Sequence, residues 1–362
     1  MEEKRVFSSF RDPSGFLFYR DERLFRQVNK VYREDFELMI NSGLYKKLVE
    51  CRLLIPHVDA DIPFFEPEKG YKVIQPEIIP FISYPYEWCF SQLKDAALAT
   101  LKIQKTAFEF GMFLKDCSAY NIQFYNGLPI LIDTLSLQKY QLGEPWVAYR
   151  QFCQHFLAPL ALMSLKDIRF NQLLRIYMDG VPLDFAKKLL PFKMSLFSHI
   201  HLHASVQSYF QDKQIKTSAY KISKVSFMGL VDNLEGAVSK LAWSAKGTEW
   251  SDYYDKMGYS AEAFKSKKAA VGDFLDRIKS RNCWDLGANQ GVFSRIAADK
   301  GIDVVSFDSD PAAVENNYLE CVKQGNKNIL PLLIDLANPS PCIGWQNQER
   351  GSFVERGPAD VV

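Results

Sequence analysis

The chain has 362 residues, of which 47% are hydrophobic and 14% aromatic, so it can bury the cores of about two or three domains. Its net charge of +1 gives no electrostatic reason to expect a nucleic-acid partner, although a local basic face would suffice. The start, MEEKRVFSSF, lacks the apolar core of a signal peptide, and the most apolar stretch, FLAPLALMSL, is too short to span a bilayer. Seven scattered cysteines without a Cys-x-x-Cys pair indicate neither a disulfide framework nor a zinc site, so we expect a cytoplasmic protein without a membrane partner.

The first part of the chain predicts a hairpin, an interrupted helix and an irregular stretch. Residues 15–28 contain two β-forming runs around a polar Asp-Glu-Arg turn, which predicts a β-hairpin. Residues 33–55 space their apolar side chains with a helical period, and Gly43 is expected to interrupt this helix. Six prolines between residues 56 and 85 then predict extended, loop-rich chain.

Helices are expected to dominate the middle of the chain. Residues 91–110 are rich in Ala, Leu and Lys, which predicts a helix with Ser91 as the candidate N-cap. Residues 147–210 are expected to be mostly helical, and residues 233–280 to form polar helices before the pattern changes.

A group of polar residues follows the first long helix, in the stretch LKDCSAYNIQFYNGLPILIDTLSL. Asp116 stands five residues before Asn121, and Asp133 stands twelve residues after it. Phosphotransfer needs an aspartate that orients or deprotonates the accepting hydroxyl, and an asparagine and an aspartate that hold Mg²⁺. The stretch resembles the catalytic region of protein-kinase-like and aminoglycoside-phosphotransferase-like folds. That resemblance implies an α+β kinase-like domain that uses Mg-ATP, with Asp116 as the base and Asn121 and Asp133 as metal ligands.

Other features of those folds are missing from the sequence. There is no glycine-rich loop, and Lys72 is the candidate for the strand lysine. The triplets LKD and IDT stand where the family has HRD and DFG. A plain β-hairpin with ordinary turn-forming residues explains the same stretch. We therefore expect no ATP hydrolysis, and a domain of this shape could instead bind the acceptor for a different reaction.

From residue 281 the pattern changes to alternating strands and helices. NCWDLG, IDVVSFD and NILPLLID are apolar strands, and the helical segments GVFSRIAADKG and PAAVENNYLECVKQG lie between them. Strands separated by helices of this length imply right-handed crossovers and a parallel sheet. The sequence therefore predicts an α/β fold with a doubly wound parallel sheet at this end of the chain.

The first of these strands runs into a glycine loop, DLGANQG. Gly287 and Gly291 lack the middle glycine of the dinucleotide fingerprint, and no Gly-Lys-Ser/Thr of a phosphate loop follows. A ligand without phosphate remains, and Asp285 suits one that carries positive charge. Asp308 and Asp335 end the next two strands, at the edge where open α/β sheets bind ligands, and Asp308 can accept hydrogen bonds from ribose hydroxyls. These aspartates could also be caps and turn formers, but three in register with a glycine loop favour a binding site.

The motifs DLGANQG, FDSDP and LLIDLANP make residues 281–362 similar to class I S-adenosylmethionine-dependent methyltransferases. In that family the first loop wraps the methionine end of the cofactor, the second acid holds the ribose and the third flanks the adenine. The resemblance therefore assigns Asp285, Gly287, Asn289 and Gly291 to the methionine end, Asp308 to the ribose and Asp335 to the adenine.

The leading hypothesis is a methyltransferase whose catalytic residue and acceptor, small or macromolecular, the motifs do not identify. We expect a kinase-like domain over residues 1–215, a helical connector and possible cofactor lid over 216–280, and the first half of a Rossmann-like domain over 281–362. Aromatic residues of the connector, including Tyr259, could close over the cofactor or simply pack between domains. The whole chain also resembles bacterial proteins described as class I methyltransferases, some of them linked to nodulation. The alternatives are an ATP-dependent phosphotransferase and a non-catalytic binding protein.

The sheet of the last domain is expected to be incomplete. The methyltransferase family builds seven strands, and this sequence supplies three and the start of a fourth near Asp360. Because the cofactor lies between the first and fourth strands, one side of the cleft would be missing and the first strand would be an exposed edge. We expect the chain alone to be inactive, to bind the cofactor weakly at best and to aggregate, with a longer chain or a partner supplying the missing half.

Overall fold

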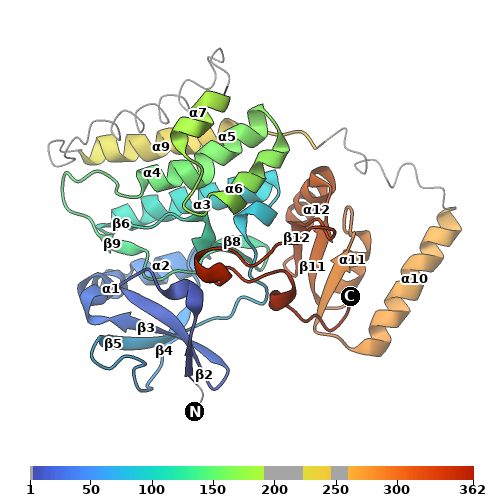
Figure 1. The fold of residues 1–362 in the computed structure, drawn as a ribbon, viewed down its shortest axis with the longest axis horizontal. Helices are drawn as coiled ribbons and strands as arrows, with labels where there is room; N and C mark the ends of the chain where they lie inside the picture. Colours follow the sequence, from blue (N-terminus) through green and yellow to red (C-terminus); the bar gives the residue numbers. More distant parts are fainter. Residues whose placement is uncertain (1–2, 191–222, 246–259) are drawn as a thin grey trace.

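The computed structural model describes residues 3–190, 223–245 and 260–362, whose arrangement Figure 1 shows. The protein is a mixed α/β molecule with several sheets, and none of the sheets in these residues is closed. An antiparallel sheet and a group of helices form one side of the molecule, and a small parallel sheet near the C-terminus lies on the other (Figure 1). None of the helices in these ranges combines the length and apolar character that crossing a bilayer requires.

A five-stranded antiparallel sheet begins the fold, in the order β1-β2-β3-β5-β4. Its strands are β1 (Glu3–Arg5), β2 (Gly15–Arg20), β3 (Arg23–Asn29), β4 (His57–Asp59) and β5 (Gly70–Pro76). The predicted hairpin is confirmed, because β2 pairs with β3 and the turn residues Asp21 and Glu22 adopt φ of +48° and +63°. The proline-rich stretch also forms β4 and β5, which the sequence did not predict, and its prolines fall outside these strands except for Pro76 at the end of β5.

The predicted interruption at Gly43 is confirmed. It separates α1 (Arg33–Asn41) from α2 (Leu44–Glu50) with a φ of +85°, a backbone conformation that glycine adopts at little cost. The helical segment ends at Glu50, five residues before the predicted end.

The long helix α3 (Phe90–Glu109) spans the predicted 91–110 segment, but its N-cap is Cys89 rather than Ser91. Ser91 has a different role, because its backbone N–H donates to Glu315 Oε2 at 3.0 Å and its hydroxyl donates to Glu315 Oε1. The first turn of α3 is therefore tied to the C-terminal part of the chain.

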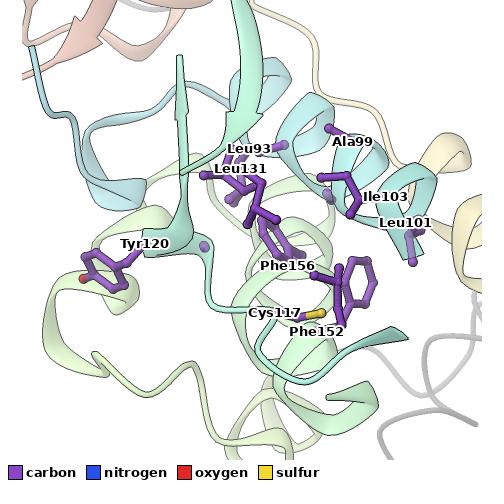
Figure 2. Close-up of a cluster of buried hydrophobic side chains, with 14 of the residues drawn as sticks. Leu93, Ala99, Leu101, Ile103, Cys117, Tyr120, Leu131, Phe152 and Phe156 are labelled. Carbon is purple, nitrogen blue, oxygen red and sulfur yellow. The ribbon is translucent and has the colours of Figure 1, made fainter. Parts of the chain in front are cut away.

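The main core lies beside α3. Figure 2 shows Leu93 and Ile103 of this helix within the same buried cluster as Phe152 and Phe156. The helices that follow confirm the helical prediction as far as residue 190, and they are α4 (Tyr149–Phe152), the π-helix η5 (Cys153–Leu157), α5 (Ala158–Leu165), η6 (Ile168–Gln172), α6 (Leu173–Ile176) and α7 (Leu183–Leu189). Residues 191–210, the rest of that prediction, lie outside the described residues.

Two short antiparallel strand pairs lie between α3 and α4 in the chain. β6 (Met112–Leu114) pairs with β9 (Leu137–Lys139), and β7 (Ile122–Tyr125) pairs with β8 (Leu128–Leu131). The stretch with the predicted phosphotransfer residues therefore does contain a β-hairpin, formed by β7 and β8.

The alternation predicted from residue 281 is confirmed. The strands β10 (Asn282–Leu286), β11 (Asp303–Asp308) and β12 (Ile329–Leu333) form a parallel sheet in chain order. They are connected by α11 (Val292–Ala298) and α12 (Pro311–Gln324). On the outer edge of β10, Trp284 N–H donates to Val361 O at 2.9 Å, and Val361 forms a parallel bridge with Cys283. The chain thus returns beside the first strand where the sequence predicted the start of a fourth.

A continuous hydrophobic core joins the parallel sheet to the N-terminal half. Phe307 and Leu332 belong to the same buried cluster as residues of α3. The ring centroids of Phe81 and Phe307 lie 5.9 Å apart. Polar contacts cross the same boundary, since Gln92 Nε2 donates to Pro331 O at 3.0 Å. One face of the sheet is therefore packed against the N-terminal half.

The segment expected to be a connector contains two described helices with different neighbours. α9 (Lys224–Lys240) packs on α3, where the rings of Phe227 and Phe108 stack with their centroids 4.3 Å apart. α10 (Ala261–Ile278) leads into β10 and contacts α11. The aromatic residues proposed as a cofactor lid, including Tyr259, lie outside the described residues.

Candidate functional site

A cavity of about 440 Å³ lies at the carboxyl ends of β10, β11 and β12, and we call it the strand-end cavity. Four of the six predicted cofactor residues line it: Gly287, Asn289, Asp308 and Asp335. The cavity is completed by Phe307, Ser309, Ile334, Leu336 and Ala337. The sequence motifs of three separate strands therefore meet around a single space.

Backbone hydrogen bonds hold the glycine loop against the end of β11. The N–H groups of Gly287 and Ala288 both donate to Phe307 O at 2.9 Å. Gly287 and Asn289 have positive φ, of +76° and +48°, so the loop turns sharply where it faces the cavity. Apart from Gly287 and its two chain neighbours, no atom of the described residues lies within 4 Å of the position of a Cβ at Gly287, so the space beside this backbone is open.

Asp308 connects the glycine loop to the turn that follows β11. Its Oδ2 accepts the Asn289 N–H at 2.8 Å, and its Oδ1 accepts the Asp310 N–H at 2.9 Å. An ionised carboxylate has about four lone-pair sites, so each oxygen retains room for one further donor. The half-buried carboxylate can therefore hold the loop and accept two ligand hydroxyls at the same time.

Asp285 and Gly291 were also predicted to contact the cofactor, but they are not among the residues that line the cavity. Asp285 Oδ2 accepts the Ser294 hydroxyl at 2.6 Å, and Ser294 Oγ in turn accepts the Ser306 hydroxyl at 2.8 Å. Burial raises the pKa of Asp285 and the charge of Asp308 adds to this, while the hydrogen bond from Ser294 opposes it. Asp285 thus attaches α11 to the sheet from behind the loop.

Gly291 begins α11 at a point of close contact with α12. A Cβ at this position would lie 2.3 Å from Asn317 Oδ1, and the residue has a φ of +74°. The positive φ and the contact with Asn317 both favour glycine at this position, and neither reason involves a ligand. Asp335, in contrast, is exposed at the mouth of the cavity, where its Oδ1 accepts the Ala337 N–H at 2.8 Å.

A second cavity, of about 560 Å³, adjoins the first, and we call it the neighbouring cavity. The two share Ser309, Ile334 and Asp335. The other wall of the neighbouring cavity comes from the N-terminal half, including Tyr86 and the segment 167–175. The Tyr86 hydroxyl is buried and has no hydrogen-bond partner among the described residues.

The predicted phosphotransfer residues meet in a third cavity, of about 320 Å³, which we call the N-terminal cavity. Asp116 follows β6, Asn121 precedes β7 and Asp133 follows β8, and all three line this space. Lys72, the candidate for the strand lysine, lies in β5 and pairs with Asp59 at 2.7 Å. It is not among the residues that line the cavity.

A basic side chain, that of Arg26 in β3, forms an ion pair with Asp133. Asp133 Oδ2 also accepts the Ser136 hydroxyl at 2.7 Å. Burial alone would raise the pKa of Asp133, but the Arg26 guanidinium and the Ser136 hydroxyl favour the carboxylate, so the pKa lies below the ordinary value of 3.8. Among the described residues there is no cluster of three or more His, Cys, Asp or Glu side chains that could hold a metal ion.

Comparisons with known proteins give one strong relative. No protein-family profile matches the chain. The chain is 36% identical over 371 residues to the nodulation protein NoeA of Rhizobium meliloti (strain 1021), a match that covers 99% of this chain and 77% of NoeA. The chain belongs to the NoeA family. A solved structure of vaccinia related kinase 3 aligns with 73% of this NoeA-family chain at 12% identity, but its TM-score of 0.28 is too low to support any conclusion.

Sequence reasoning missed several residues that line the cavities of this NoeA-family chain. Arg26 pairs with a residue 107 positions away, and Glu349 and Arg350 reach the N-terminal cavity from the far end of the chain. Tyr86 reaches the neighbouring cavity from a proline-rich stretch. No local spacing links these residues, so only the folded structure reveals them.

Proposed function

We propose that this chain binds S-adenosylmethionine in the strand-end cavity and transfers its methyl group to an acceptor. The observation that carries the proposal is the meeting of Gly287, Asn289, Asp308 and Asp335 at the carboxyl ends of parallel strands, where open α/β sheets bind ligands. The cavity volume of about 440 Å³ is in the range of small-molecule sites. A Rossmann-like, doubly wound arrangement of this sheet is part of the proposal.

Each residue of the cavity would bind a different part of the cofactor. Asp308 would accept the two ribose hydroxyls, Gly287 would let the methionine end approach the backbone, and Asp335 would flank the adenine at the mouth. A sulfonium carries an already activated methyl group, so the protein needs mainly to align the acceptor with it. Asp285 would act indirectly, by fixing α11 and the glycine loop.

The acceptor would occupy the neighbouring cavity. This space shares Ser309, Ile334 and Asp335 with the strand-end cavity, so a molecule bound there would lie beside the cofactor. The segment 167–175 and Tyr86 would then select the acceptor, with the unpartnered Tyr86 hydroxyl free to bond to it. On this proposal the N-terminal half is the acceptor-binding part of the enzyme.

Calorimetry with S-adenosylmethionine tests the proposal on a matched pair of aspartates. Asp308→Ala should weaken binding by about 100-fold or more, because hydrogen bonds to a charged group are worth roughly 1.5–3 kcal/mol each. Asp310, two residues later, caps α12 through the N–H groups of Ala312 and Ala313. Asp310→Ala should therefore lower the unfolding free energy by about 1 kcal/mol and leave the affinity nearly unchanged. A folded Asp308→Ala protein that binds as tightly as the wild type would contradict the proposal.

Phosphotransfer is a second candidate, favoured by the convergence of Asp116, Asn121 and Asp133 in the N-terminal cavity. The pairing of Asp133 with Arg26 opposes it, because a guanidinium lies against the carboxylate that would bind Mg²⁺. Titration with Mg-ATP in the same calorimeter separates the two functions. We expect no binding, and a metal-dependent phosphotransfer that Asp133→Ala abolishes would establish this second function instead.

A further inference from the structure

The N-terminal cavity is rich in charge and has more acids than bases. Five carboxylates line it against three guanidinium groups: Asp12, Asp116, Asp133, Asp179 and Glu349 against Arg11, Arg26 and Arg350. Lys115, just outside the lining, lies 3.5 Å from Asp12 and reduces the excess of negative charge without removing it.

Most of these charges are already paired within the protein. Arg26 pairs with Asp133, and Arg11 pairs with both Asp179 at 3.0 Å and Glu349 at 2.7 Å. These pairs use the carboxylates that a metal ion would need. The cation of an incoming ligand must therefore find a different carboxylate.

Asp116 is that carboxylate. Its Oδ1 accepts the Ser118 N–H at 2.9 Å and the Gln151 side-chain amide at 2.7 Å, both neutral donors, and it has no ion pair within the described residues. The remaining cation, Arg350, donates to the backbone oxygen of Glu349 and lies over the ring of Tyr120, 4.5 Å from its centroid.

A buried histidine gives an independent indication of a ligand. His155 lines the same cavity and is 1% exposed, and within the part of the chain that the structure describes its buried Nδ1 has no hydrogen-bond partner. It lies in the π-helix η5, a helix type that is frequent at functional sites. Gly180 packs close to this ring, because a Cβ at that position would lie 3.0 Å from His155 Cδ2. Burial lowers the pKa of His155 to about 4, so at neutral pH the imidazole keeps a lone pair.

We propose that the N-terminal cavity binds an organic ammonium ion, held by the Asp116 carboxylate together with Asn121 and His155. An ammonium group has three donors and no acceptor, which matches a carboxylate, an amide oxygen and a neutral imidazole. The cavity volume of about 320 Å³ corresponds to a small ligand. This site is separate from the strand-end cavity, so it does not depend on the proposed methyl transfer.

Calorimetry on the full chain with 1,4-diaminobutane and 1,4-butanediol, at neutral pH and low salt, tests this proposal. The two probes have the same carbon chain and differ in charge, so the diamine should bind and the diol should not. Asp116→Asn keeps the shape of the side chain and should weaken diamine binding at least tenfold. Asp59→Asn is the control, because this exposed carboxylate pairs with Lys72 outside the cavity, and it should leave binding unchanged.

The histidine gives the second arm of the test. His155→Leu should weaken diamine binding, whereas His155→Asn, which keeps a polar atom near the Nδ1 position, should retain most of it. Equal binding of diol and diamine, or diamine binding that Asp116→Asn leaves intact, would overturn the proposal. S-adenosylmethionine affinity measured on the same variants should not change, so failure here is distinct from failure of the proposed methyltransferase.

Discussion

At the scale of single residues, burial sets the charge of two histidines in the N-terminal half. It lowers the pKa of both His57 and His155 to about 4, well below the ordinary value of 6.5. In the unfolded chain each imidazole gains its proton near pH 6.5, whereas in the folded protein it stays neutral until about pH 4. The stability that these residues contribute is therefore complete above pH 6.5 and is lost as the pH falls toward 4.

We predict that His155→Gln flattens this dependence of stability on pH. Lowering the pKa of a buried histidine from 6.5 to about 4 corresponds to about 3 kcal/mol of unfolding free energy. Urea unfolding at several pH values between 7.5 and 4 measures the slope. The wild type should lose stability steadily over this range, and the variant should lose less of it. His57→Gln, at a half-buried position, should show the smaller effect, and a variant slope equal to that of the wild type would contradict the prediction.

At the scale of elements, the glycine loop after β10 contains two glycines with different functions. Gly287 lines the strand-end cavity and has open space beside it, while Gly291 packs against Asn317. Both have positive φ, so alanine at either position brings a backbone cost of about 1–3 kcal/mol. Only at Gly291 is a steric clash added, because a Cβ there would overlap the Asn317 side chain.

We predict opposite outcomes for the two alanine substitutions. Gly291→Ala should lower the unfolding free energy by more than 2 kcal/mol, because strain and clash add. Gly287→Ala should cost about 1 kcal/mol but should weaken S-adenosylmethionine binding at least tenfold, because its new methyl group would project into the cavity. Thermal unfolding and calorimetry on both variants give the comparison. A Gly291→Ala protein as stable as Gly287→Ala would show that α11 and α12 can separate without cost.

The elements themselves were predictable where local signals agree. The parallel sheet from residue 281 combines apolar strands with helices that are followed by Gly301 and Gly325, both with positive φ, so its order could be predicted from the sequence. The strands β4 and β5 could not, because prolines masked short pieces whose pairing depends on β3. Local capping signals were also insufficient at Ser91, whose hydroxyl bonds to Glu315 on α12 instead of capping α3.

In the candidate site, too, local sequence predicted some residues, while the roles of others depend on packing. Asp308 could be predicted because its place at a strand end follows from the chain itself, and it does line the strand-end cavity. Asp285 and Gly291 belong to the same motif, but their roles depend on Ser294 and Asn317, which contact them only after α11 and α12 pack on the sheet. A motif therefore located the loop but did not identify which of its residues face the ligand.

At the scale of the whole molecule, a buried ion pair connects the two halves. Arg356 donates to both oxygens of Glu87, at 2.8 Å and 2.6 Å, and to the backbone oxygen of Ile82 at 2.8 Å. The side chains of Arg356 and Glu87 are only 7% and 1% exposed. Glu87 also accepts the Ser340 hydroxyl at 2.6 Å, so the segment after β12 is attached to the start of the helical region at two points.

Because the core and this ion pair both cross between the halves, we predict that the protein unfolds in one transition and that Arg356→Met lowers its stability by about 3–5 kcal/mol. The loss would come from Glu87, which would remain buried without its cation. Arg169→Met is the control, since Arg169 pairs with Asp167 at an exposed site and such a pair contributes at most about 1 kcal/mol. Adding Glu87→Gln to Arg356→Met should recover part of the loss, because the buried charge is then removed.

Urea unfolding followed by tryptophan fluorescence and by circular dichroism tests both statements, since Trp88 lies in the N-terminal core and Trp284 in the parallel sheet. Two separate transitions in the wild type would mean that the halves fold independently. An Arg356→Met protein as stable as Arg169→Met would mean that this ion pair does not hold together the cavity that the two halves share.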